Sequence, residues 1–115
     1  MKISSLALSF LFTLSVFAEN KELHSALKPI PRQGGWMKRH DSFNKRVAQG
    51  KVDLVLIGDS ITQGWEGRGK KAWEKHYGKR NAVNLGIGGD RTQHVIWRLD
   101  NGNLKGISPK AAVVM

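Results

Sequence analysis

The sequence contains no cysteine among its 115 residues. This absence excludes disulfide bonds, thiol nucleophiles and cysteine metal ligands, so the fold must rely on an ordinary hydrophobic core. Acidic residues are also scarce, because nine Asp and Glu stand against 19 Lys and Arg, a formal net charge of +10. The basic residues, Arg98 among them, are scattered and form no dense block. We therefore expect solvated helix faces and loops, and no nucleic-acid partner.

Long apolar runs are missing too, with one exception near the start of the chain. Residues 3–17 form a continuous apolar and serine stretch that follows Lys2 and precedes Ala18. The stretch is short for a hydrocarbon core of about 30 Å. This pattern favours a secretory signal peptide over residues 1–18, cleaved before Glu19, with an uncleaved membrane anchor as the alternative. We therefore predict an exported protein, periplasmic or extracellular, without stable membrane insertion after cleavage.

The remaining chain predicts alternating helices and strands. Residues 19–35 contain two of the three prolines and are expected to form a leader without regular structure. Residues 36–115 then form the domain. Helices are expected over residues 36–49, 72–77 and 92–101, a short helix or turn over 60–65, and strands over 52–57, 81–85 and 111–115. This order is typical of an α/β fold with a parallel sheet. Because the sequence stops within an apolar strand, we expect the N-terminal part of a larger domain, truncated within its third strand.

Ser60 is the candidate nucleophile. It lies in the segment Gly-Asp-Ser-Ile-Thr (58–62), directly after the first predicted strand. In open α/β sheets, ligands bind at the carboxyl ends of the strands. An ordinary serine that caps the following helix is the alternative. The backbone N–H of Ser60 and that of Gly89, in the glycine-rich segment after the second predicted strand, are candidate oxyanion donors. A simple glycine turn is the alternative for Gly89.

The four histidines offer no clear general base. His24 lies in the leader, and we expect His40 and His76 on solvated helix surfaces. His94 follows Asp90 by four residues, a spacing that supports a contact on one helix face, and a structural role is the better interpretation. Two tryptophans, at positions 65 and 97, are expected in the core, with an acyl or sugar site as the alternative.

Two segments carry a family resemblance. Residues 58–62 together with 84–90 (Asn-Leu-Gly-Ile-Gly-Gly-Asp) resemble the SGNH/GDSL hydrolase superfamily. The longer segment 84–99 is similar to the catalytic subunits of type Ib platelet-activating factor acetylhydrolases and their bacterial relatives. The resemblance implies a flavodoxin-like three-layer sandwich and a serine esterase that needs no metal or cofactor.

The same resemblance assigns roles to residues of this sequence. Ser60 would be the nucleophile, its amide and that of Gly89 two of three oxyanion donors, and Asp59 a structural neighbour, as is Asp90. The family's third donor, an asparagine in a Gly-Thr-Asn-Asn segment, and its Asp-x-x-His motif are absent from the 115 residues.

These observations predict an exported serine esterase that hydrolyses small acyl esters, above all acetyl esters, of a carbohydrate or lipid. An acetylated carbohydrate is one candidate substrate, and the oligomeric state is left open. The alternatives are a glycan-binding α/β module without catalytic activity or an inactive truncated product. A dinucleotide-binding motif is set aside, because Arg91 occupies its third glycine position.

Overall fold

The computed structural model describes residues 22–115 of the chain. The predicted signal peptide and its cleavage site lie outside these residues. The elements in chain order are η1 (Ser25–Leu27), α1 (Gly35–Ala48), β1 (Leu54–Gly58), α2 (Ser60–Gln63), η2 (Gly64–Glu66), α3 (Lys70–His76), β2 (Ala82–Gly86), α4 (Thr92–Arg98), η3 (Leu99–Asn103) and β3 (Ala111–Val114). Within the described part of the chain, no helix has the length and apolar character that a membrane span requires.

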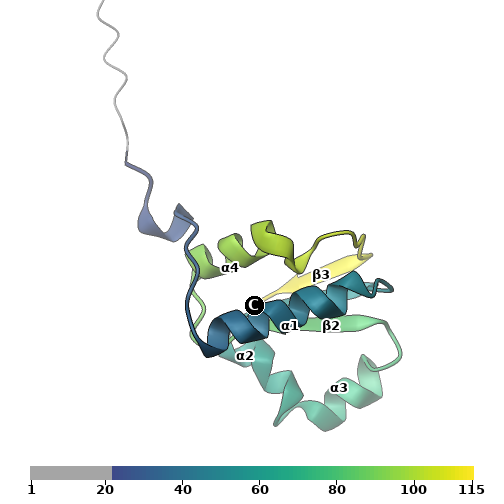
Figure 1. Cartoon of the computed structure of the whole chain (residues 1–115). Helices are drawn as coiled ribbons and strands as arrows, with labels where there is room; N and C mark the ends of the chain where they lie inside the picture. Colours follow the sequence, from purple (N-terminus) through teal and green to yellow (C-terminus); the bar gives the residue numbers. More distant parts are fainter. Residues whose placement is uncertain (1–21) are drawn as a thin grey trace, which may run out of the picture.

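The three strands form one parallel sheet in the order β2-β1-β3 (Figure 1). β1 therefore lies in the centre, and its last residue, Gly58, is paired with Gly86, the last residue of β2. This register places the ends of both strands, and the turns that follow them, at the same edge of the sheet. The predicted α/β class with a parallel sheet is confirmed.

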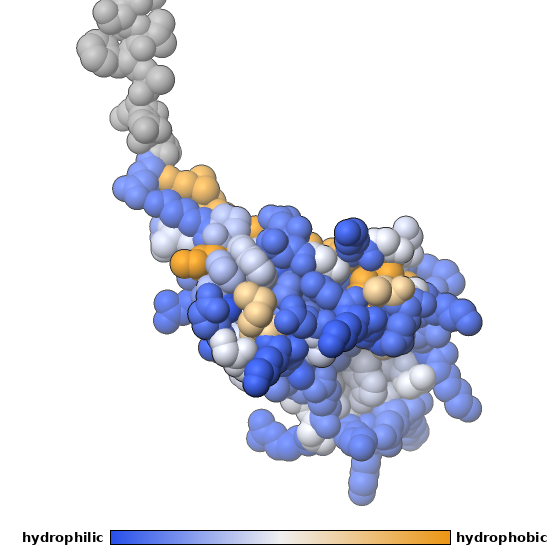
Figure 2. Space-filling view, in the orientation of Figure 1, coloured by the Kyte–Doolittle hydropathy of each residue, from blue (hydrophilic) through white to orange (hydrophobic). Residues whose placement is uncertain are grey.

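Helices cover the two faces of this sheet because the side chains of a strand alternate between them. On one face, Trp36 and Phe43 of α1 pack in a single apolar cluster with Val55, Val83 and Leu85 of the strands. α4 contributes partly buried side chains to the same cluster. On the opposite face, the buried Asn84 amide donates to the Thr62 carbonyl of α2 at 2.8 Å. The exposed side of α1 is hydrophilic (Figure 2).

Two segments differ from the elements expected for them. The helix expected over 92–101 is α-helical to Arg98 and continues as the π-helical turn η3, in which Asn101 and Gly102 leave helical backbone angles, Gly102 with a φ of +116°. The leader expected to lack regular structure contains η1, which the ring nitrogen Nδ1 of His24 caps by accepting from the Ala26 amide. The leader also contacts the domain, since the Ile30 amide donates to the Gln93 carbonyl at 3.3 Å.

Gly86 permits the close approach of α2 to the sheet. A Cβ at this position would lie 2.7 Å from the Thr62 carbonyl carbon and 2.8 Å from Thr62 Cβ. We therefore expect Gly86→Ala to lower the free energy of unfolding by about 1–3 kcal/mol, because the backbone must shift to admit the methyl group. Gly35→Ala is the control, since no atom lies within 4 Å of its added Cβ. Chemical denaturation measures the stability of both variants. Equal unfolding midpoints would contradict the close packing of α2 against Gly86.

Candidate active site

Ser60 stands at the exposed start of α2, immediately after the central strand. The capping role belongs to Asp59, whose Oδ1 accepts a hydrogen bond from the Ile61 amide at 2.9 Å. The structure therefore assigns the cap to the residue before Ser60, and the alternative of a helix-capping serine does not hold. Among residues 22–115, neither the hydroxyl nor the amide of Ser60 has a hydrogen-bond partner.

The glycine-rich turn after β2 lies next to Ser60. A Cβ built on Gly88 would be 3.6 Å from Ser60 Cβ. The Gly88 amide is engaged, because it donates to Gln63 Oε1 at 2.7 Å. Gly89 is exposed with a φ of +76°, and its amide has no hydrogen-bond partner within the described residues. The structure thus brings the predicted nucleophile and the two predicted donor residues to one edge of the sheet.

Asp90, the residue after Gly89, is held in a buried ion pair. Its side chain has no exposed surface and accepts from Arg98 Nε at 2.8 Å and from Trp36 Nε1 at 2.6 Å. A guanidinium nitrogen of Arg32 lies at 3.4 Å and also donates to the Gly88 carbonyl at 3.0 Å. A buried carboxylate is tolerated only when it is paired and hydrogen-bonded, and Asp90 meets both conditions.

Arg98 is fully buried, so the expectation that it lies on a solvated surface was wrong. Besides Asp90, its guanidinium donates to the Gly58 carbonyl at 3.1 Å and to Asn103 Oδ1 at 3.1 Å. Burial lowers the pKa of Arg98, and the hydrogen bond that Arg98 donates to Asp90 opposes that shift. The sequence contained a signal for this pair, since Asp90, His94 and Arg98 are spaced four residues apart, although Asp90 itself lies just before α4.

His40 is likewise buried, which corrects the expected surface position. Only 3% of it is exposed, and its ring stacks on Trp36 with centroids 5.8 Å apart. Asn103 Nδ2 lies 3.1 Å from its Nδ1. Its position in a four-residue row with Trp36 and Asn44 along α1 could have indicated the burial.

The other described histidines have contacts or positions that do not involve the Ser60 hydroxyl. His94 Nδ1 accepts from the Arg91 amide at 3.0 Å and lies 3.9 Å from Asp90 Oδ1, in the structural position that the spacing predicted. His76 is exposed at the end of α3, and His24 caps η1. No histidine among residues 22–115 makes a hydrogen bond with Ser60.

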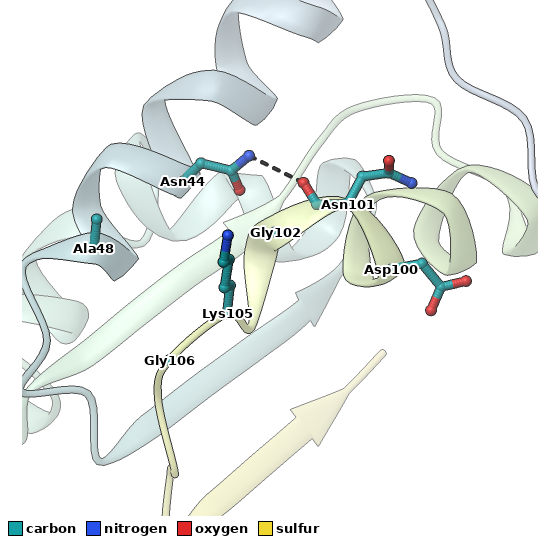
Figure 3. A pocket seen from close by; sticks show the side chains of 7 residues that line it. All are labelled: Asn44, Ala48, Asp100, Asn101, Gly102, Lys105 and Gly106. Carbon is teal, nitrogen blue, oxygen red and sulfur yellow. Dashed lines mark hydrogen bonds between the residues drawn. The ribbon is translucent and has the colours of Figure 1, made fainter.

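Several hollows border these elements, including one away from Ser60 and one beside it. The larger, of about 720 Å³, is lined by residues of α1, η3 and the loop that leads into β3 (Figure 3). It lies toward the starts of the strands, away from Ser60. The smaller, of about 300 Å³, lies beside Ser60 and is bordered by Ile61, Trp65 and Arg68.

Trp97 joins the core as expected. The described residues contain no cluster of three or more His, Asp or Glu suited to a metal ion.

The sequence of this part of the chain matches a known family. The profile of the GDSL-like lipase/acylhydrolase family matches residues 56–115, from β1 through both turns to the end of the chain. The chain therefore belongs to this family, and the predicted superfamily is confirmed.

Curated relatives point to one group within the family. Platelet-activating factor acetylhydrolase IB subunit alpha1 of Homo sapiens is 41% identical over 98 residues, which cover 81% of this chain and 42% of that protein. The alpha1 subunit of Rattus norvegicus is 42% identical over 94 residues, which cover 77% of this chain and 40% of that protein. The alpha2 subunit of Homo sapiens is 37% identical over 89 residues, which cover 77% of this chain and 38% of that protein. The chain thus spans about two fifths of the length of these relatives.

The buried His40 generates a pH-dependent contribution to stability. Burial lowers its pKa below the usual value of about 6.5, although Asp41 opposes the shift. Below pH 6.5 the unfolded chain binds a proton that the folded chain does not, so the free energy of unfolding falls as pH decreases from about 7.5 to 5. His40→Asn should flatten this profile in urea denaturation. His94, whose pKa burial also lowers, leaves a residual slope in both proteins. Identical slopes with and without His40 would contradict the assignment.

Proposed function

We propose that this chain carries the nucleophile and two oxyanion donors of a serine ester hydrolase. The observation that carries the proposal is the position of Ser60, exposed at the end of the central strand and in van der Waals reach of the Gly88-Gly89 turn. The family match and the acetylhydrolase relatives support the same reaction. In this reaction, Ser60 Oγ attacks the carbonyl carbon of an ester while its proton passes to a base.

The amides of Ser60 and Gly89 then stabilise the oxyanion that develops on the former carbonyl oxygen. Both amides are available, because neither has a hydrogen-bond partner within residues 22–115. The alcohol leaves as the acyl group remains on Ser60 Oγ, and water hydrolyses the acyl-enzyme. The base and the acid that orients it are assigned to residues outside 22–115, since the rings of His24, His40 and His94 have other contacts and His76 does not border the hollow beside Ser60.

The substrate class proposed is a small acyl ester, with acetyl as the first candidate. The relatives are named acetylhydrolases, and the hollow beside Ser60 has a volume of only about 300 Å³. Ile61 and Trp65 give that hollow an apolar wall, while Arg68 adds a donor for a polar leaving group. Carbohydrate and lipid acetates both satisfy this description, and comparison of their kcat/KM values distinguishes them.

Export is proposed on the basis of residues 1–18 alone. N-terminal sequencing of the protein made in its own host tests this directly. A mature chain that begins at Glu19 supports export through a cleaved signal peptide. A chain that retains residues 1–18 rejects it and favours the membrane anchor.

Removal of the Ser60 hydroxyl tests the proposed reaction. In the full-length protein, we expect Ser60→Ala to lower kcat for p-nitrophenyl acetate by about a thousand-fold or more, as in serine hydrolases that lose the nucleophile. The KM should change little, because the hydroxyl contributes mainly to the chemical step.

Ser42→Ala is the matched control, since Ser42 is exposed on α1 and its hydroxyl donates only to the Arg39 carbonyl. It should retain full activity. Hydrolysis that persists unchanged in Ser60→Ala would reject Ser60 as the nucleophile. Absence of hydrolysis in the unsubstituted protein, together with binding of an acetylated oligosaccharide, would favour a glycan-binding module.

A further inference from the structure

We propose that Arg98 is a positioning residue for the oxyanion site, in that its buried guanidinium sets the separation between the Ser60 amide and the Gly89 amide. This inference rests on the proposed function, in which both amides bind the oxyanion. Arg98 lies at the end of α4, outside both turns, and would act through their backbone rather than on the substrate.

The β1–β2 ladder stops at the pair Gly58 and Gly86, and one further backbone bond joins the Ile87 amide to the Gly58 carbonyl at 3.2 Å. Past this point, no backbone hydrogen bond within residues 22–115 links the segment 59–60 to the segment 88–89. The relative position of the two amides therefore depends on side chains.

Arg98 spans this gap with one rigid group. Its terminal nitrogen donates to the Gly58 carbonyl, two residues before Ser60, and its Nε donates to Asp90 Oδ2, one residue after Gly89. A guanidinium is planar and its donors are fixed relative to one another. The two contacts, at 3.1 and 2.8 Å, therefore lock one turn against the other.

The guanidinium is itself immobilised. Its third contact is to Asn103 Oδ1, and the second oxygen of Asp90 is held by Trp36 Nε1 at 2.6 Å. Arg98 and the Asp90 side chain both have 0% exposure, so water does not compete for these contacts. Gln63 adds a separate restraint through the Gly88 amide, but Gln63 contacts neither Gly58 nor Asp90.

Lysine cannot reproduce this geometry. An ammonium group is a compact point charge on a flexible stem, so it can keep the charge beside Asp90 without also holding the Gly58 carbonyl in a fixed plane. Arg98→Lys thus separates the positioning role from the requirement for a buried cation.

The test measures hydrolysis of p-nitrophenyl acetate by Arg98→Lys in the protein with all residues that its gene encodes. We expect kcat to fall by about 10²–10³-fold, the usual cost of losing one oxyanion donor, while KM changes less than about threefold. Methylguanidinium added to Arg98→Ala should restore part of kcat. Arg46→Lys is the matched control, because Arg46 holds the Gly50 carbonyl at 3.0 Å near the opposite end of the sheet, and it should retain kcat.

A purely structural role would not split kcat from KM in this way. Full kcat in Arg98→Lys, with hydrolysis still dependent on Ser60, would overturn the positioning role and leave the proposed function intact. If Arg98→Lys fails to fold, Trp36→Phe removes the indole donor to Asp90 and keeps an aromatic ring in the core position beside His40. It should lower kcat severalfold at constant KM, and an unchanged kcat would overturn the inference.

A second measurement does not depend on activity. It still tests the role of Arg98 if the protein shows no Ser60-dependent hydrolysis, a result that would reject the proposed function but not the positioning role. Backbone ¹⁵N order parameters of Ser60 and Gly89 should be about 0.85 with Arg98 and below about 0.6 in Arg98→Lys. The order parameter of Val55, in the centre of β1, should be the same in both. Equal values at Ser60 and Gly89 in the two proteins would reject the positioning role.

Discussion

The buried ion pair between Arg98 and Asp90 is the constraint on which the site depends. Two charges without solvent exposure are tolerated only when every strong donor and acceptor finds a partner, and loss of one partner typically costs about 3–5 kcal/mol. Here the further partners come from four parts of the chain: the Gly58 carbonyl at the end of β1, Trp36 on α1, Asn103 in η3, and Arg32 in the segment before α1. The position of each element is therefore tied to the others through one polar cluster.

This cluster explains features that lie far from Ser60. Asn103 reaches Arg98 from η3 only because the chain turns sharply after α4, and Gly102 provides the φ of +116° for that turn. Asn103 Nδ2 also donates to Asn44 Oδ1 at 2.7 Å, and the Asn44 amide donates to the Asn101 carbonyl (Figure 3). α1 is thus attached to η3 by the polar contacts of Asn44 and to Asp90 by the Trp36 indole.

The sheet could be predicted from sequence because its signals are local. β-branched runs, glycines at strand ends and the order of elements indicated the α/β class, and the two glycine-containing segments indicated where Ser60 and Gly89 lie. The placement of those residues at one edge is what a parallel register requires.

The buried polar residues that support the site, Arg98 and His40, were not predicted, for a physical reason. Arg98 and His40 belong to residue types that are mostly solvated, and their burial depends on partners up to 63 residues away. Composition favoured the surface for both. The four-residue rows that contain them show which helix face they occupy, but not that Gly58 or Asn103 completes their hydrogen bonds.

The central claim is that Ser60 forms the acyl-enzyme. The most direct measurement is rapid acid quench of the protein, with all residues that its gene encodes, during turnover of p-nitrophenyl acetate, followed by mass spectrometry of its peptides. We expect an acetyl group on Ser60 that appears within the first turnover and disappears when the substrate is exhausted. Steady turnover with no acetylated Ser60, or with the acetyl group on another residue, would contradict it.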